Sequence, residues 1–178
     1  INNIIPLESD ESISAILAIK NFDEDSYLFL TTRDGMVNRM SLSSFKKVRN
    51  SGLKAILLKS NDYLFNALHT TGNDKIILSS TSGKSIMFSE SQIRERSRGT
   101  QGVTGIKLPR GSKIISSLNV QCSQVIFVTE NGFGNKISVD SYNEQNRGGQ
   151  GVISIKTSER NGQVVGAANL DNTDHIIL

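Results

Sequence analysis

Apolar and polar residues alternate along most of this chain of 178 residues, in short runs that end at turns containing glycine. This period of two is typical of half-buried β-strands, and no stretch keeps apolar residues at helical spacing over three turns. We therefore predict an all-β fold. The clearest strand pairs flank turns that end in glycine, because glycine adopts the positive φ of tight hairpins. These hairpins are predicted as 27–32 with 36–40, 75–80 with 84–88, and 124–129 with 133–137.

The hairpins recur at a nearly fixed interval. Their turn glycines, Gly35, Gly83 and Gly132, are separated by 48 and 49 residues, and Gly102 and Gly151 of a second glycine-rich stretch are separated by 49. A period of this length is typical of four-stranded propeller blades and too long for the common helical repeats. We expect the chain to be a piece of a longer repeat domain. The predicted units are 27–70, 75–120 and 124–170, with partial units at 1–20 and 175–178.

Each predicted unit completes its sheet with segments that follow the hairpin. A polar segment headed by serine ends in a large apolar residue, Phe45, Ile93 or Tyr142, which we expect to fill the core of the unit. A basic glycine loop comes next. The remaining strands are predicted at 12–20, 53–58, 63–68, 103–108, 114–118, 152–155 and 164–168.

Composition limits the chemistry of the chain. A single cysteine, Cys122, excludes an intrachain disulfide and a cysteine-based metal site, and we interpret it as a buried, unreactive thiol. The two histidines, His69 and His175, lie at unrelated positions of the repeat and outside any metal-ligand spacing. We predict no catalytic residue, metal site or cofactor in this chain. No apolar run is long enough for a membrane helix and no signal peptide is visible, which favours a cytoplasmic protein without a membrane partner.

Positive charge follows the period of the repeat. The net charge is only +3, but residues 35–61 carry six Lys and Arg and no Asp or Glu, and residues 94–113 carry six against one. A weaker excess, four against three, lies in residues 136–160. If the units stack around an axis, residues at one phase share one rim, and that rim is basic. We predict a strip that binds a polyanion; the alternative is that these side chains only solvate exposed loops.

The predicted phosphate contacts are the basic residues of this strip. Glycines beside them let the backbone come close to a phosphate chain, although tight turns and a bulge at a strand start explain the same glycines. The basic residues are Lys46, Lys47, Arg49, Lys54, Arg96, Arg98, Lys107, Arg147, Lys156 and Arg160, and the glycines are Gly99, Gly102, Gly148, Gly149 and Gly151.

Three stretches carry a family resemblance: Gly-Val-Thr-Gly-Ile-Lys-Leu at 102–108, Gly-Val-Ile-Ser-Ile-Lys at 151–156, and Glu-Arg-Asn-Gly-Gln-Val-Val-Gly-Ala at 159–167. They are similar to the C-terminal domain of the bacterial DNA gyrase A protein, and the resemblance covers essentially the whole chain. It implies a six-bladed β-pinwheel whose blades exchange strands, of which this chain would hold three to four. The family's defining box, Gln-Arg-Arg-Gly-Gly-Lys-Gly, is represented only by Gln-Asn-Arg-Gly-Gly-Gln-Gly at 145–151.

The resemblance also implies a function, which is to bend and wrap double-stranded DNA around the basic rim and thereby to support negative supercoiling. Cleavage and ATP hydrolysis with Mg²⁺ would belong to other parts of an ATP-dependent type II topoisomerase. The partners in that enzyme would be the rest of the gyrase A protein and the gyrase B protein, in an A2B2 complex. Two alternatives stay open. One is the similar domain of the topoisomerase IV protein that corresponds to gyrase A, which would select substrate geometry. The other is a propeller-type protein-interaction module, against which the aromatic content of 6% argues.

Overall fold

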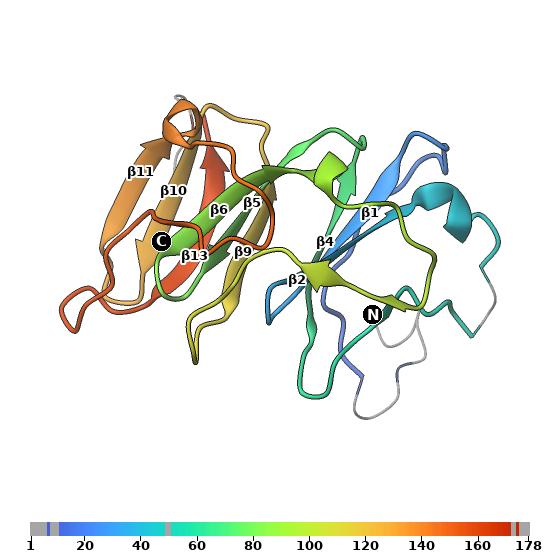
Figure 1. The fold of residues 1–178 in the computed structure, drawn as a ribbon, viewed down its shortest axis with the longest axis horizontal. Coiled ribbons are helices and arrows are strands. Elements are labelled where there is room, and N and C mark those ends of the chain that lie inside the picture. Colours follow the sequence, from blue (N-terminus) through green and yellow to red (C-terminus); the bar gives the residue numbers. More distant parts are fainter. Residues whose placement is uncertain (1–6, 8–10, 49–50, 172–173, 175–178) are drawn as a thin grey trace.

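The computed structural model describes residues 7, 11–48, 51–171 and 174. In these residues the chain forms thirteen strands and three short 3-10 helices, and it forms no α-helix. Figure 1 shows three sheets standing side by side along the long axis of the molecule. The prediction of an all-β repeat fold is confirmed. No helix of the described part is long and apolar enough to cross a membrane.

The first sheet has the strand order β4-β1-β2-β8, and all its pairs are antiparallel. Its members are β1 (Tyr27–Thr32), β2 (Met36–Ser41), β4 (Leu64–Thr70) and β8 (Val103–Thr104). Strands β1 and β2 form the predicted hairpin, and β4 closes the sheet on the other side of β1. Strand β8 belongs to the following unit, so the first sheet is completed by a strand that the second unit donates.

The second sheet repeats this arrangement in the order β12-β6-β5-β9. It contains β5 (Lys75–Ser80), β6 (Lys84–Ser89), β9 (Ile114–Asn119) and β12 (Val152–Ile153), and β12 is donated by the third unit. The third sheet has the order β11-β10-β13, from β10 (Gln124–Thr129), β11 (Gly134–Ser138) and β13 (Val164–Leu170).

Shorter elements connect the sheets. Strands β3 (Ile56–Leu57) and β7 (Thr100–Gln101) form a parallel pair between the first and second units. The helices η1 (Leu42–Phe45), η2 (Glu90–Gln92) and η3 (Val139–Ser141) follow the three hairpins, each after a serine in the N-cap position. The serine-headed polar segments of the sequence are therefore single helical turns, which the sequence pattern did not predict.

Two hydrophobic cores hold the sheets together, one on each face of the second sheet. Ile76 and Leu78 of β5 pack toward the first sheet with Phe29 and Val37, and all four side chains are fully buried. The residue between them, Ile77, packs toward the third sheet. The second sheet is thus buried on both faces, which explains why β5 and β6 each contain three consecutive apolar residues, 76–78 and 86–88.

The three residues expected to fill the cores of their units have different environments in the structure. Ile93 and Tyr142 are buried in the first and second core, as predicted. Phe45, the equivalent residue of the first unit, is only half-buried and belongs to neither core. The reason is positional: the outer face of the first sheet is covered by no other sheet of the described residues.

The strand predicted at 12–20 is wrong. This segment forms no strand, and Ile16 is 75% exposed. Strands β4, β9 and β13 each pair with the first strand of a hairpin, but no hairpin of the described residues lies beside 12–20. The strands predicted at 53–58, 103–108 and 152–155 are shortened to two residues each, because these segments cross from one sheet to the next instead of following one sheet.

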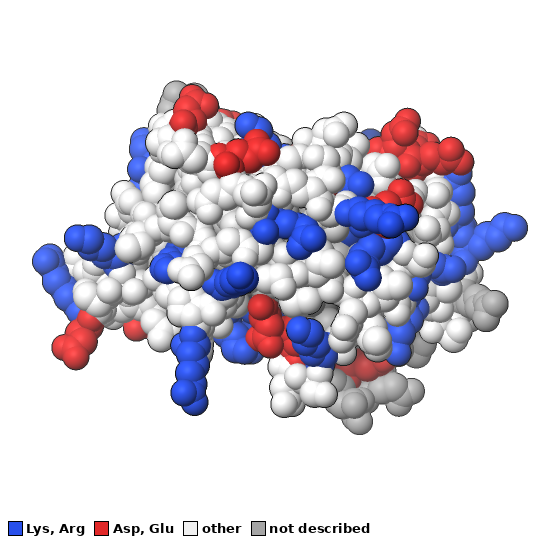
Figure 2. All heavy atoms as spheres, viewed as in Figure 1, with Lys and Arg blue, Asp and Glu red and all other residues white. Residues whose placement is uncertain are grey.

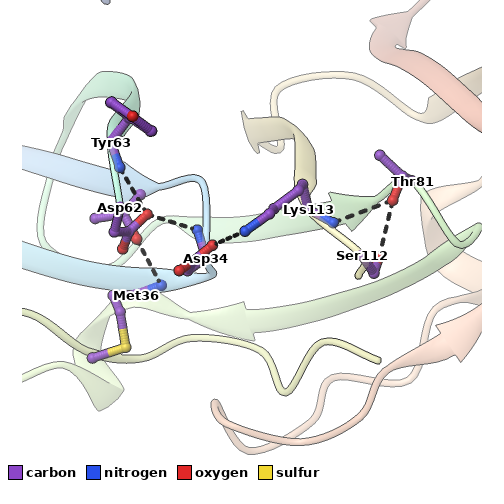
Figure 3. A network of polar contacts seen from close by, with 8 residues as sticks. Asp34, Met36, Asp62, Tyr63, Thr81, Ser112 and Lys113 are labelled. Carbon is purple, nitrogen blue, oxygen red and sulfur yellow. Dashed lines mark hydrogen bonds and ion pairs between the residues drawn. The ribbon is translucent and has the colours of Figure 1, made fainter. Parts of the chain in front are cut away.

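A polar network joins the turns of the first two sheets (Figure 3). The Asp62 carboxylate accepts hydrogen bonds from the backbone N–H groups of Asp34, at 3.0 Å, and Tyr63, at 2.9 Å. The side-chain ammonium of Lys113 forms an ion pair with Asp34, and the backbone N–H of Lys113 donates to the Thr81 hydroxyl. Because Lys113 is paired with a carboxylate, it adds little to the positive charge of residues 94–113.

The turn glycines offer a test of strand exchange. In both Gly83 and Gly111 φ is positive, +76° and +80°. A Cβ at Gly83 would lie 2.1 Å from the carbonyl oxygen of Ile155 on the donated segment, whereas a Cβ at Gly111 would meet no atom within 4 Å. We expect Gly111→Ala to lower the free energy of unfolding by about 1–2 kcal/mol, the cost of a left-handed residue with a Cβ. Gly83→Ala should cost at least twice as much, because the donated segment must also move. Equal losses in urea unfolding would contradict strand exchange at this turn.

Candidate nucleic-acid interface

Two segments carry the donated strands from one unit to the next: residues 94–107 and 144–156 (Figure 1). Each segment is fixed to the unit before it by a glycine N–H. Gly99 donates to the carbonyl of Ala55 at 2.8 Å, and Gly148 donates to the carbonyl of Gly105 at 2.6 Å. Both glycines have positive φ, +72° and +77°. The glycine loops therefore set where the basic side chains on these segments lie.

Three further glycines allow the donated segments to lie against the preceding sheet. A Cβ at Gly102 would lie 2.8 Å from the carbonyl oxygen of Val37, and one at Gly151 would lie 2.5 Å from that of Ser85. A Cβ at Gly149 would lie 3.3 Å from the Ile86 side chain. Close packing thus accounts for these glycines, and a direct contact between their backbone and a phosphate stays a prediction.

The structure brings three of the predicted basic residues together around one cleft of about 750 Å³. Lys47 and Lys54 come from the first unit, and Arg98 comes from the second. Val48, Leu53, Ser97 and Gly99 complete the lining, and none of these residues is a carboxylate. A cleft with cations on both walls and no acidic lining is suited to a ligand that carries several negative charges.

Arg98 is exposed at the mouth of this cleft. Its guanidinium lies 5.8 Å from the centre of the Phe45 ring, a geometry in which the ring attracts a cation. Lys46 is exposed just after η1. Arg96 is half-buried, and its backbone N–H donates to the carbonyl of Arg39 at 3.0 Å.

Arg147 has a different environment from Arg98, although both precede a glycine at the same position of the repeat. Its Nε donates to the carbonyl of Gln92 at 3.2 Å, and a terminal guanidinium nitrogen donates to the carbonyl of Thr104 at 3.1 Å. The Gln92 side chain returns two bonds, accepting from the Arg147 backbone N–H and donating to the carbonyl of Gln145. Arg147 and Gln92 therefore hold the third unit against the second through hydrogen bonds. We call this pair of residues the clasp.

The other predicted contacts are spread along the chain. Lys107, Lys156 and Arg160 are exposed outside the cleft, and the Arg160 guanidinium lies 4.9 Å from the centre of the Phe133 ring. Arg49 lies outside the described residues. The sequence carries no signal for the part played by Gln92, because its importance arises only from contacts between units.

Figure 2 shows how charge is arranged on the face across which the donated segments run. Lys and Arg side chains form a broken band across the middle of this face, with uncharged surface between them, while Asp and Glu side chains lie mainly toward its two upper corners and its lower edge. The positive band crosses all three sheets. A flexible polyanion lying along it would touch successive units.

The remaining reactive groups suit a structural role. Burial raises the pKa of the Tyr142 phenol, whose hydroxyl forms a 2.8 Å hydrogen bond with Ser154. Desolvation and the Asp171 carboxylate raise the pKa of the Cys122 thiol, which is half-buried and not fully buried as predicted. No group of three metal-ligating side chains occurs within the described ranges.

Successive antiparallel sheets that exchange strands and carry a basic band define a propeller-like repeat domain of the pinwheel type. A sequence model described as "DNA gyrase C-terminal domain, beta-propeller" matches residues 26–71, 74–121 and 123–171. The chain belongs to this family of DNA gyrase C-terminal domains, as the sequence resemblance indicated.

Similar proteins and structures agree with this assignment. The chain is 40% identical to the DNA gyrase A protein of Escherichia coli over 177 residues, which are 99% of this chain and 20% of that protein. It is 37% identical to the DNA gyrase A protein of Neisseria gonorrhoeae, covering all of this chain and 24% of that protein. The chain thus spans a fifth to a quarter of these relatives.

Two solved structures share the fold. A DNA gyrase A C-terminal domain superposes with a TM-score of 0.84 at 32% identity, covering 95% of this chain and 57% of that one. The C-terminal domain of DNA topoisomerase IV superposes with a TM-score of 0.85 at 27% identity, covering 94% of this chain and 53% of that one.

The clasp can be tested with a pair of substitutions that keep the charge. Lysine cannot make the two guanidinium bonds of Arg147, so Arg147→Lys should lower the free energy of unfolding by about 1–2 kcal/mol. Arg98→Lys removes no bond to another described residue and should change stability by less than about 0.5 kcal/mol. Urea unfolding followed by circular dichroism measures both. If the hydrogen bonds of Arg147 do not stabilise the fold, the two substitutions will change the free energy of unfolding by equal and small amounts.

Proposed function

We propose that this chain binds duplex DNA along its basic face and wraps it, as part of a DNA gyrase A protein. The observation that carries the proposal is the cleft in which Lys47, Lys54 and Arg98 converge from two units, with no acidic residue among its described lining residues. Membership of the gyrase C-terminal domain family supports the choice of DNA as the polyanion.

Binding would arise from neutralisation of phosphates. Lys and Arg side chains displace the counterions that surround DNA, and the release of these ions favours the complex. The cleft is lined by cationic, aliphatic and small side chains, which suit the phosphate backbone better than base edges. The protein would therefore bind with little sequence preference, and its affinity would fall steeply with salt.

Wrapping follows from repetition of the same contact. Because successive blades of a propeller-like fold are arranged around an axis, and shared cores and exchanged strands hold these units together, DNA that stays in contact with the band would bend from one unit to the next. In the whole enzyme this bend would favour negative supercoiling, while strand cleavage and ATP hydrolysis with Mg²⁺ would take place elsewhere in an assembly of the gyrase A and gyrase B proteins. The relatives that favour gyrase over topoisomerase IV are the gyrase A sequences reported above.

A triple charge reversal tests the proposal. Lys47, Lys54 and Arg98 changed together to Glu should reduce the dependence of log K on log salt by about 0.9 for each contact, or about 2.7 in total. A matched control reverses Lys20, Lys59 and Lys136, which are exposed outside the cleft and give the same change in net charge. Fluorescence anisotropy with a short duplex of mixed sequence measures both slopes.

The control variant should retain most of the slope of the unchanged protein. Equal losses of salt slope in the two variants would mean that only net charge matters, and would contradict the assignment of the cleft as a DNA-binding site. Wrapping is measured separately: the unchanged chain and the control should alter the linking number of a plasmid closed in their presence, whereas the cleft variant should not.

A further inference from the structure

The joint between the first and second units and the joint between the second and third are built from equivalent positions of the repeat. Arg98 and Arg147 are 49 residues apart, and Val48 stands 50 residues before Arg98. In the same way Lys54, Thr104 and Ile153 follow one another at intervals of 50 and 49 residues. If the basic band were uniform, residues at equivalent positions of the repeat would have the same contacts at both joints. Their contacts differ between the two joints.

At the second joint the arginine, Arg147, stabilises the contact between units. Two donors of the Arg147 guanidinium are held by the carbonyls of Gln92 and Thr104, and the side chain is half-buried. Thr104, which takes the place of Lys54 at the second joint, is uncharged and half-buried, and its carbonyl is one of the two acceptors of Arg147. With two of its five N–H groups bonded and its side chain half-buried, Arg147 is less available to a phosphate than the exposed Arg98.

At the first joint the cations are free. None of the described residues accepts a hydrogen bond from the Arg98 guanidinium, which lies over the Phe45 ring and not against a carbonyl. The half-exposed position of Phe45, outside both cores, leaves its ring available to hold the guanidinium at the cleft. The Gly99 N–H bond to Ala55 fixes the two walls relative to each other.

We propose that the cleft at the first joint is the principal phosphodiester-binding site of the described chain, with Arg98 as its central cation, whereas the equivalent second joint is a structural clasp. Phe45 acts as a positioning residue for Arg98. The inference rests on the proposed DNA-binding function and deepens it, because it assigns unequal shares of the binding to equivalent arginines. DNA would then be held most firmly over the first two units.

The loss-of-contact variant is Arg98→Ala. One lost phosphate contact should reduce the salt slope by about 0.9 and weaken binding about eightfold at 0.1 M salt, with no change in the melting temperature. Phe45→Leu removes the ring while keeping an apolar side chain, and it should lower affinity in the same direction by a smaller factor. The probe is a short duplex of mixed sequence measured by fluorescence anisotropy.

Two further variants separate binding from stability. Val48→Arg introduces into the cleft lining an arginine at the position that Arg98 and Arg147 occupy in the other units. It should increase the salt slope, and it should increase the affinity by up to about eightfold at 0.1 M salt. Arg147→Lys retains the charge and should lower the melting temperature while leaving the salt slope of the folded protein unchanged.

The results separate failure of the inference from failure of the function. If the unchanged chain does not bind the duplex, or binds it without salt dependence, the proposed function itself fails. If the unchanged chain binds but Arg147→Ala, measured well below its melting temperature, reduces the salt slope as much as Arg98→Ala does, the unequal division is wrong. The same holds if Val48→Arg brings no gain and Arg98→Ala brings no loss.

Discussion

Burial of the second sheet on both faces is the constraint on which the rest of the structure depends. Ile76 and Leu78 contribute to one core and Ile77 to the other, and all three are fully buried. Full burial of one such side chain stabilises a fold by about 1.5–3 kcal/mol, so the three account for several kcal/mol that a free-standing sheet would lack. A unit of this repeat therefore depends on a neighbouring unit for much of its stability, and the relative orientation of the units is set by their shared cores.

Strand exchange adds a second constraint and determines where the cations lie. The donated segments must approach the preceding hairpin so closely that a Cβ at Gly102 or Gly151 would clash with a backbone carbonyl. The loop just before each of these glycines crosses from one sheet to the next, and Arg98 and Arg147 stand on these loops. Packing of the donated strands and placement of these two arginines are thus consequences of the same crossing.

The hairpins could be predicted from the sequence because their signals are local. Alternation and a turn glycine within about fifteen residues gave β1, β5 and β10 with the boundaries that the structure has. The errors concern features that depend on a neighbouring unit. The segment 12–20 has the composition of a strand but no hairpin of the described residues beside it, and Phe45 has the size of a core residue but no facing sheet. Periodicity reports which residues prefer burial, and it does not report whether a partner surface is present.

The candidate site shows the same limit in electrostatic terms. The sequence placed Arg98 and Arg147 in one class because they share a position in the repeat and a following glycine. The difference between them lies in what each guanidinium contacts: that of Arg147 donates to the carbonyls of Gln92 and Thr104, whereas that of Arg98 lies over the Phe45 ring. An arginine that is partly bonded to carbonyls is less available to phosphate, so a periodic count of cations overstates the number of phosphates that the chain would contact. Which arginines the fold leaves unpaired then limits the contacts of the proposed DNA-binding face.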